Sequence, residues 1–387
     1  MKELFTGFYR KSEEEIKEFW KNGIIIFDTN VLLNLYRYSD NTRNAILNLI
    51  GKFSNQIYLP YQAAFEYNKN RCEVIAEQEK AYKEFLEKIT QIKKDLQSTN
   101  KPPFLSQEVD KELNSAFIKV NTEVEDSLKK YSHYLREDPI YDKISELFEN
   151  RITEKYDDSK LNSIYKSGEE RFKLKIPPGF EDEKSKDGNN KYGDLVLWNQ
   201  VIELAKAKNK NVILITDERK SDWWWKIKDG RTMGPRFELV KEMKEQANVG
   251  FHMYSSERFL EYGLNFLKEQ INKEALDEIS ALKRAEMEKI RRFEINKRER
   301  ELTKESIRKE SLQIENQIQE IDYIISKINE ELHQCSEKIV SKFNEGEKIE
   351  EELNEEYKNI SKHLEHFLKE REIFIYKRKK LRTNQRR

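Results

Sequence analysis

Four acidic residues, Asp28, Glu66, Asp194 and Asp217, stand where predicted strands end or predicted helices begin. Asp28 and Asp217 each terminate an apolar, β-branched run of the kind that forms a buried parallel strand. Glu66 lies one turn into a helical segment, and Asp194 precedes an apolar helical stripe. Because open α/β sheets bind ligands at the carboxyl ends of their strands, we expect these four carboxylates to lie at one edge of a sheet.

Carboxylates gathered in this way require a cation. Two of them about 4 Å apart repel by roughly 4 kcal/mol at an effective dielectric constant near 20. Oxygen ligands without His or Cys favour Mg²⁺ or Mn²⁺, and such an ion can activate water for an in-line phosphoryl displacement. His133 falls in a predicted helix and His252 in a predicted strand, so we expect metal-activated water rather than a histidine base.

Each acid also has an ordinary structural explanation. Asp28 and Asp194 can cap helices, and a carboxylate in the first turn, such as Glu66, is favoured by the helix dipole. A further acid, Asp222, stands directly before three consecutive tryptophans, Trp223–Trp225. We expect these rings either to cover the sheet edge or to provide stacking surfaces. The convergence of four acids on one edge favours a site over capping alone.

Composition limits the class of protein. The chain has 387 residues, of which 37% are charged, and 72 Lys and Arg balance 72 Asp and Glu. Any nucleic acid must therefore be held by local basic patches. The two cysteines, Cys72 and Cys335, match no metal-binding spacing and indicate a reducing compartment. No run approaches the roughly 18 apolar residues of a membrane helix, so we expect a soluble, cytoplasmic protein with no membrane partner.

Residues 1–262 predict an α/β domain with a central parallel sheet, since strands alternate with helices. Strands are expected at 23–27, 56–59, 211–216 and 251–254. Helices are expected at about 31–50, 62–95, 107–135, 140–168, 194–207, 236–246 and 256–270. The polar stretch 73–172 is interpreted as a large helical insertion with a turn at Lys101–Pro103.

Residues 263–387 predict a long α-helical coiled-coil tail. After Gly263 there is no Pro and a single Gly, Gly346. Apolar residues from Ile314 to Ile339 recur at alternating spacings of four and three, and a second such stripe runs from Leu353 to Phe367. The pattern fits either a helical hairpin with a break at Gly346 or a homodimer, and the regularity of the first stripe favours the dimer.

In combination, these motifs resemble the PIN-domain nucleases, and most closely a bacterial PIN-like subgroup first catalogued as a domain of unknown function. The resemblance covers about residues 5–262. It rests on Asp28-Thr29-Asn30, Leu59-Pro60 before Glu66, Asn70-Arg71, Ile176–Phe180, Lys191-Tyr192-Gly193-Asp194, Thr216-Asp217 through Asp222-Trp223-Trp224, and Gly234-Pro235-Arg236. It implies a Rossmann-like PIN fold and metal-dependent cleavage of phosphodiester bonds, usually in RNA.

The resemblance also implies roles for individual residues. Those expected to bind Mg²⁺ or Mn²⁺ are Asp28, Glu66, Asp194 and Asp217, with Asp222 as a fifth catalytic acid. Asn30 and Thr216 would hold these acids in place. One departure is Glu218, which stands where a second Asp is expected, so the metal-binding acid after Thr216 can be Asp217, Glu218 or Asp222. Asp182 can also reach the edge.

Several cations flank the acids and could neutralise phosphates. They are Arg71, Lys191, Arg219, Lys220, Arg231 and Arg236. In a chain this charged, an ordinary role as a solvated surface cation is favoured over phosphate contact for each of them. The basic end of the tail, Lys377–Lys380 with Arg386 and Arg387, fits either nucleic acid or a protein partner.

The sequence supports three interpretations. The first is a metal-dependent endoribonuclease acting on single-stranded RNA, as a toxin or antiviral effector. The second is a structure-specific DNA nuclease with similar carboxylates. The third is a non-catalytic scaffold assembled through its tail, as a homodimer or with a regulatory protein; an intact acidic quartet argues against it.

Overall fold

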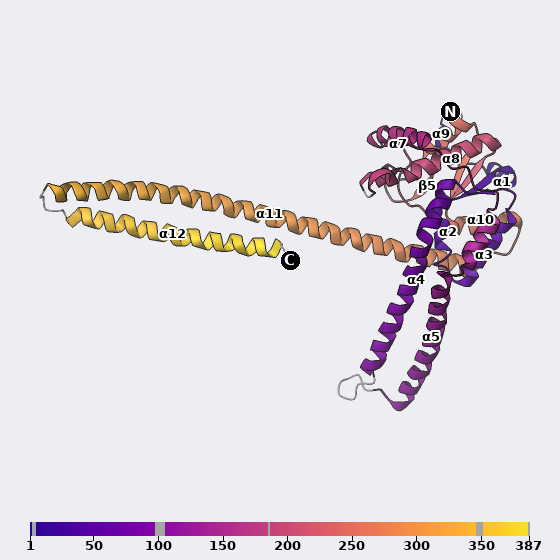
Figure 1. The fold of residues 1–387 in the computed structure, drawn as a ribbon, viewed down its shortest axis with the longest axis horizontal. Helices are drawn as coiled ribbons and strands as arrows, with labels where there is room; N and C mark the ends of the chain where they lie inside the picture. The colour runs from indigo at the N-terminus through magenta and orange to yellow at the C-terminus, as the bar shows by residue number, and fades with distance from the viewer. Residues whose placement is uncertain (2–4, 97–104, 185, 346–350, 386–387) are drawn as a thin grey trace. The chain divides into compact units, whose positions relative to one another are not determined.

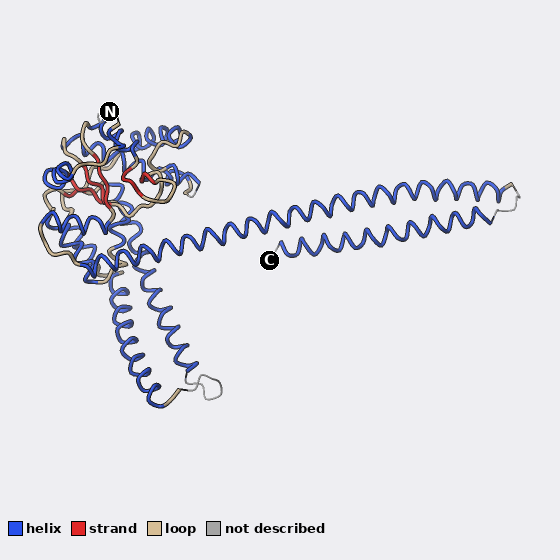
Figure 2. The backbone as a smooth tube through the Cα atoms, turned by 180° about the vertical axis from the view of Figure 1, so that it is seen from behind, coloured by secondary structure: helices blue, strands red, loops and turns tan. Residues whose placement is uncertain are grey.

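The computed structural model describes residues 1, 5–96, 105–184, 186–345 and 351–385. The chain divides into two compact units, residues 1–283 and 284–387. The first unit contains a small parallel sheet surrounded by helices, as Figure 2 shows in red and blue. The predicted turn at Lys101–Pro103 and the predicted break at Gly346 lie outside the described residues.

Four parallel strands form the central sheet, in the order β2-β1-β3-β6. They are β1 (Ile24–Phe27), β2 (Ile57–Tyr58), β3 (Val212–Ile215) and β6 (Phe251–Tyr254). Each agrees with a predicted strand, and the parallel sheet is confirmed. β1 and β3 pair along their whole length, with Phe27 opposite Ile215. Asp28 and Thr216, the residues that follow, therefore leave the sheet side by side.

The helices of the first unit are mostly those expected. They are α1 (Glu13–Asn22), α2 (Thr29–Asn34), α3 (Asp40–Lys52), α4 (Tyr61–Leu96), α5 (Gln107–Tyr134), α6 (Pro139–Leu147), α7 (Asp158–Lys173), α8 (Gly193–Lys208), α9 (Phe237–Ala247) and α10 (Ser256–Leu267). Three short 3-10 helices are η1 (Thr6–Phe8), η2 (Phe180–Lys184) and η3 (Gly188–Tyr192). α4 and α5 lie side by side as a helical hairpin (Figure 1).

The structure corrects the prediction at several elements. α1 was not expected, although Ser12 and Glu15 form a reciprocal capping box at its start. The single helix predicted over 31–50 is two, because Ser39 ends the intervening turn and caps α3. The helix predicted over 140–168 is also two, α6 and α7, and Asp157 caps the second. A two-stranded antiparallel hairpin, β4 (Trp224–Lys226) and β5 (Thr232–Pro235), was not predicted.

α11 (Lys273–Asn344) begins in the first unit and continues into the second. Its first turns pack on the α/β domain, where Ala275 and Ile279 are buried and Glu278 accepts hydrogen bonds from Ser39 and Thr42. These contacts explain why the first compact unit extends past residue 262.

In the second unit, α11 pairs with α12 (Glu351–Gln385) in antiparallel orientation. Arg371 contacts Asp322 at 2.5 Å, and Arg378 contacts Glu315 at 3.4 Å. The residue further along α12 thus pairs with the residue earlier in α11, as expected for antiparallel helices. The stripe predicted from the sequence is the buried one, at Ile314, Ile318, Ile321, Ile328 and Cys335. These contacts favour the hairpin; a coiled-coil geometry and a homodimer stay predictions.

Within the described residues, no helix combines the length and apolar character needed to cross a membrane.

Candidate active site

Asp28 is held at the carboxyl end of β1 by three neighbours. Its Oδ1 accepts from the Thr29 amide at 2.7 Å, so Asp28 caps α2 as the ordinary explanation predicts. Its Oδ2 accepts from Thr216 Oγ1 at 2.6 Å and from Asn30 Nδ2 at 3.0 Å. Asn30 in turn accepts from the Asp217 amide at 3.0 Å. Capping and a fixed carboxylate orientation are therefore both present at Asp28.

Glu66 and Asp194 approach Asp28 from two helices. Glu66, on α4, accepts from Gln62 Nε2 at 2.7 Å and from Thr29 Oγ1 at 3.4 Å. Asp194 lies in the first turn of α8 and accepts from Trp223 Nε1 at 3.1 Å. The glycine before it packs closely on Glu66: a Cβ on Gly193 would lie 2.8 Å from Glu66 Oε1, so the Glu66 carboxylate would have to shift.

After β3 the chain turns Glu218, rather than Asp217, towards the other acids. Asp217 accepts from the Ser256 amide at 3.0 Å, from Ser256 Oγ at 2.7 Å and from Asn34 Nδ2 at 2.8 Å. Asp217 thereby anchors the start of α10. The negative charge of Glu218, by contrast, acts on both Asp28 and Asp194. The structure thus brings together Asp28, Glu66, Asp194 and Glu218.

The proximity of these acids alters their protonation. Burial raises the pKa of Asp28 to about 7, although the hydrogen bond from Thr216 opposes this rise. The charges of Asp194, Glu66 and Glu218 add to the effect of burial. Burial also raises the pKa of Glu66 and of Asp194, and each feels the charge of a neighbouring carboxylate. Such mutual repulsion is typical of a site prepared for a cation.

Two lysines, Lys220 and Lys186, lie beside this cluster, and both pair with the buried Asp182. Lys220 Nζ lies 2.7 Å from Asp182 Oδ1, 3.1 Å from Glu218 Oε2 and 3.6 Å from Asp194 Oδ2. Lys186 Nζ lies 2.5 Å from the other oxygen of Asp182. Although burial opposes ionisation, the two lysines hold the pKa of Asp182 below its usual value. From the sequence, Lys220 was expected only as a phosphate contact, and Lys186 was not expected at the site.

Asp222, predicted as a fifth catalytic acid, is fully buried and supports a loop. Its Oδ2 accepts from the amides of Gly179 at 2.9 Å and Glu181 at 3.1 Å. Gly179 has a φ of +94°, a conformation that favours glycine. Burial raises the pKa of Asp222 to about 6, against the hydrogen bond from the Glu181 amide. The acid thus positions the segment that leads into Asp182.

The three tryptophans have separate positions. Trp223 is buried, donates to Asp194 and packs edge-on against Trp198 with ring centroids 6.1 Å apart. Trp224 donates from Nε1 to the Glu218 carbonyl at 2.5 Å. Trp225 packs against Phe8 with ring centroids 5.7 Å apart. Two of the three therefore hold the acid-bearing segments, which accords with covering the sheet edge more than with stacking bases.

The cations predicted to contact phosphates mostly bind within the protein. Arg71 donates to buried Asp138 at 2.9 Å, and Arg236 pairs with Glu238 at 2.9 Å. The others bind as follows: Arg219 Nη1 donates to the Lys283 carbonyl at 3.2 Å, Arg231 pairs with Asp229 at 2.8 Å, and the Lys191 ammonium lies 5.0 Å from the centre of the Tyr192 ring. Contact with nucleic acid stays a prediction for all of them.

The donor set of the acidic cluster fits a hard divalent ion, because its ligands are all oxygens and three of its carboxyl groups have raised pKa values. The described residues contain no group of three His, Cys, Asp or Glu side chains already arranged as ligands of a metal ion. Within this cluster the Lys220 ammonium lies 3.6 Å from Asp194 Oδ2 and 3.1 Å from Glu218 Oε2.

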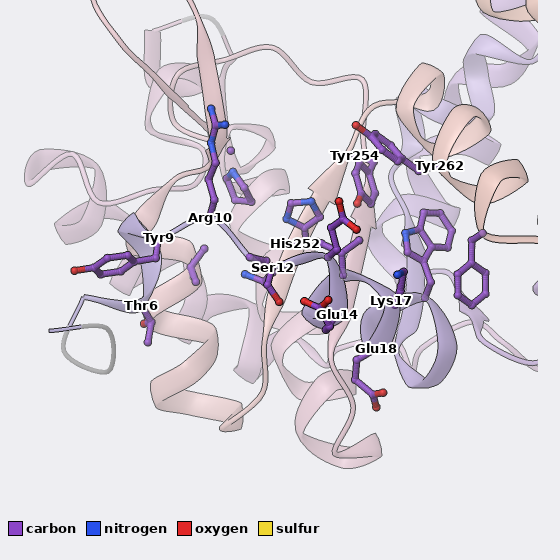
Figure 3. Close-up of a pocket in the computed structure, with 18 of the residues that line it drawn as sticks. Thr6, Tyr9, Arg10, Ser12, Glu14, Lys17, Glu18, His252, Tyr254 and Tyr262 are labelled. Atoms are coloured by element: carbon purple, nitrogen blue, oxygen red, sulfur yellow. The ribbon is translucent and has the colours of Figure 1, made fainter.

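A hollow of about 1020 Å³ lies apart from these acids, between the N-terminal segment and β6 (Figure 3). His252 and Tyr254 line it, together with residues of α1 and α10. Burial, with a further contribution from Lys11, lowers the pKa of His252 to about 3. His252 is therefore neutral at physiological pH, and it lines the hollow rather than the acidic cluster.

The fold and the acidic edge together define the class of protein. The family model of the PIN-like domain matches residues 24–239, which is more than half of the chain. The chain belongs to the PIN-like domain family. No curated protein and no solved structure matches it. The family match includes Asp28, Glu66, Asp194 and Glu218, and it places the chain in a superfamily of nucleases.

Proposed function

We propose that this protein is a nuclease that hydrolyses phosphodiester bonds with Mg²⁺ or Mn²⁺ held by Asp28, Glu66, Asp194 and Glu218. The observation that carries the proposal is the convergence of these carboxyl groups, from β1, α4, α8 and the turn after β3, on one edge of the sheet. Burial is the main cause of the raised pKa of Asp28, and the charges of Asp194, Glu66 and Glu218 add to it; a bound divalent cation would relieve the repulsion among these charges.

Each residue has a defined task in this proposal. When bound, the metal would activate water and stabilise the charge that develops on the phosphate. Thr216 and Asn30 fix the orientation of Asp28, and the Trp223 indole fixes Asp194. Support of this kind limits the movement of metal ligands and is expected to raise metal affinity.

Asp217 was predicted as the fourth ligand, and that assignment stays a prediction. We favour Glu218 because, among the described residues, the Asp217 carboxylate accepts its hydrogen bonds from Ser256 and Asn34. Asp217 would then preserve the fold around α10, and Glu218 would face the metal. Asp222 would likewise act through the loop that it supports.

RNA is the proposed substrate because PIN-domain nucleases, which the chain resembles, usually cut RNA. The test is incubation of the purified protein with labelled single-stranded RNA, single-stranded DNA and a flap duplex, each with Mn²⁺ or with EDTA. Mn²⁺-dependent cleavage of RNA supports the proposal. Cleavage confined to the flap would establish the DNA nuclease instead, and no cleavage of any substrate would favour the scaffold. A toxin or antiviral role stays a prediction from the resemblance.

A further inference from the structure

We propose that Lys220 is a built-in counter-ion of the acidic cluster and competes with the divalent ion for Asp194 and Glu218. The inference rests on the proposed function, because it concerns the same carboxylates. It assigns Lys220 a role in setting metal affinity, instead of the role in phosphate binding that its place in the sequence suggested.

The geometry of the ammonium group carries this inference. Lys220 Nζ lies 3.1 Å from Glu218 Oε2 and 3.6 Å from Asp194 Oδ2, so it lies between two of the proposed ligands. The side chain of Lys220 is only 26% exposed. An ammonium withdrawn from water in this way remains charged because the carboxylates around it compensate.

Asp182, which is not a proposed metal ligand, also holds the Lys220 ammonium. It lies 2.7 Å from Lys220 Nζ, its side chain is only 2% exposed, and its second oxygen pairs with Lys186. Asp222 supports this anchor by accepting from the amides of Gly179 and Glu181, just before Asp182. A flexible lysine side chain can therefore leave Asp194 and Glu218 while Asp182 retains it.

Competition follows from charge. In the metal-free protein, the ammonium offsets part of the repulsion among the acids. A divalent ion that binds Asp194 and Glu218 needs oxygens that Lys220 now contacts, and it repels the ammonium at short range. Lys220 should therefore stabilise the metal-free fold and weaken metal binding, so that a higher metal concentration is needed to load the site.

The test is calorimetric titration of Mn²⁺ into the full-length wild type, Lys220→Met and a matched control, Lys226→Met. Lys226 is a cation of the same segment, but its ammonium donates to the Arg219 carbonyl rather than to a carboxylate. We expect Lys220→Met to bind Mn²⁺ about tenfold more tightly or better, because one competing positive charge is removed. Lys226→Met should bind as the wild type does.

Unfolding temperature provides a second readout that is independent of activity. In EDTA, Lys220→Met should unfold at a lower temperature than the wild type. Saturating Mn²⁺ should raise the unfolding temperature of the variant by more than it raises that of the wild type. If the variant is unfolded in EDTA, saturating Mn²⁺ should restore its circular dichroism.

The outcomes separate the two proposals. Equal or weaker Mn²⁺ binding by folded Lys220→Met, with binding by the wild type intact, overturns the role of Lys220 alone. If Lys220→Met is unfolded and Mn²⁺ does not restore its fold, the role of Lys220 is likewise overturned. Absence of binding by both proteins at millimolar Mn²⁺ overturns the proposed metal site and, with it, the competition.

Discussion

Thr216 donates from Oγ1 to Asp28 Oδ2 over 2.6 Å, joining the carboxyl ends of β3 and β1. Thr216 is 1% exposed and Asp28 is half-buried, so this bond is partly shielded from water. It stabilises the ionised form of a carboxyl group whose pKa burial raises to about 7. The ability of Asp28 to carry charge at physiological pH therefore depends on a side chain almost 190 positions away in the sequence.

Replacing Thr216 with valine tests this dependence. Thr216→Val removes the hydroxyl, so the pKa of Asp28 should rise further and the pH at which Mn²⁺ binding is half-maximal should rise with it. Stability should fall by about 1–3 kcal/mol, because Glu218 N and Asn30 Nδ2 also lose an acceptor. Mn²⁺ titrations from pH 5.5 to 8.5 measure the shift, and an unchanged midpoint contradicts the role assigned to Thr216.

Asp28→Asn should change stability with a sign that depends on pH. The pKa of Asp28 is about 7 in the folded protein, against a reference value of 3.8 for the unfolded chain. The folded protein therefore binds this proton more tightly than the unfolded chain does, and it loses stability as the pH rises from about 4 to 7. Each pKa unit corresponds to about 1.4 kcal/mol.

At pH 8 in EDTA, Asp28→Asn should therefore unfold at a higher temperature than the wild type. At pH 5 the advantage should vanish, because Asp28 of the folded wild type is then protonated and carries no charge either. Thermal unfolding at the two pH values measures this difference. A variant that is less stable at both would show that Asp28 is chiefly a helix cap.

Asp217→Asn and Glu218→Gln should have opposite effects. Asp217→Asn weakens the bonds to Ser256 and Asn34, so it should cost about 1–3 kcal/mol of stability and leave Mn²⁺ affinity nearly unchanged. Glu218→Gln should weaken Mn²⁺ binding about tenfold or more with little loss of stability, because it removes a proposed ligand. Chemical unfolding and calorimetry on both variants separate the roles, and the reverse pattern would restore Asp217 as the ligand.

Gly193→Ala should disturb Glu66 directly. The added Cβ would lie 2.8 Å from Glu66 Oε1, so the carboxylate must shift from its position in the cluster. We expect about tenfold weaker Mn²⁺ binding. Gly51→Ala is the control: its Cβ comes no closer than 3.6 Å to Leu147, and inside α3 it should be neutral or stabilise by up to about 1 kcal/mol. Equal metal affinity in both variants would contradict the position of Glu66.

The central sheet was predictable because its strands are buried on both faces and appear as apolar runs. All four residues of β1 and of β3 are buried. The β4–β5 hairpin escaped prediction because Trp224–Lys226 and Thr232–Pro235 do not alternate apolar and polar residues clearly. The seam between α11 and α12 followed from heptad spacing, whereas a dimer stays a prediction that light scattering of the intact chain can test.

Within the site, residue type and element position were enough to propose Asp28, Glu66 and Asp194. The choice between Asp217 and Glu218 was not accessible, because it depends on Ser256 and Asn34, which reach Asp217 only in the folded chain. Spacing in the sequence gave no indication that Lys220 would lie between Asp194 and Glu218.

The most direct test of the central claim is calorimetric titration of Mn²⁺ into wild-type protein and Glu66→Gln at pH 8. Glu66 is a proposed ligand, and the substitution preserves its size. The account predicts saturable binding by the wild type and at least about tenfold weaker binding by the variant, with both proteins folded by circular dichroism. Equal affinity in the two proteins, or no binding by the wild type at millimolar Mn²⁺, would contradict the assignment of this acidic edge as a metal site.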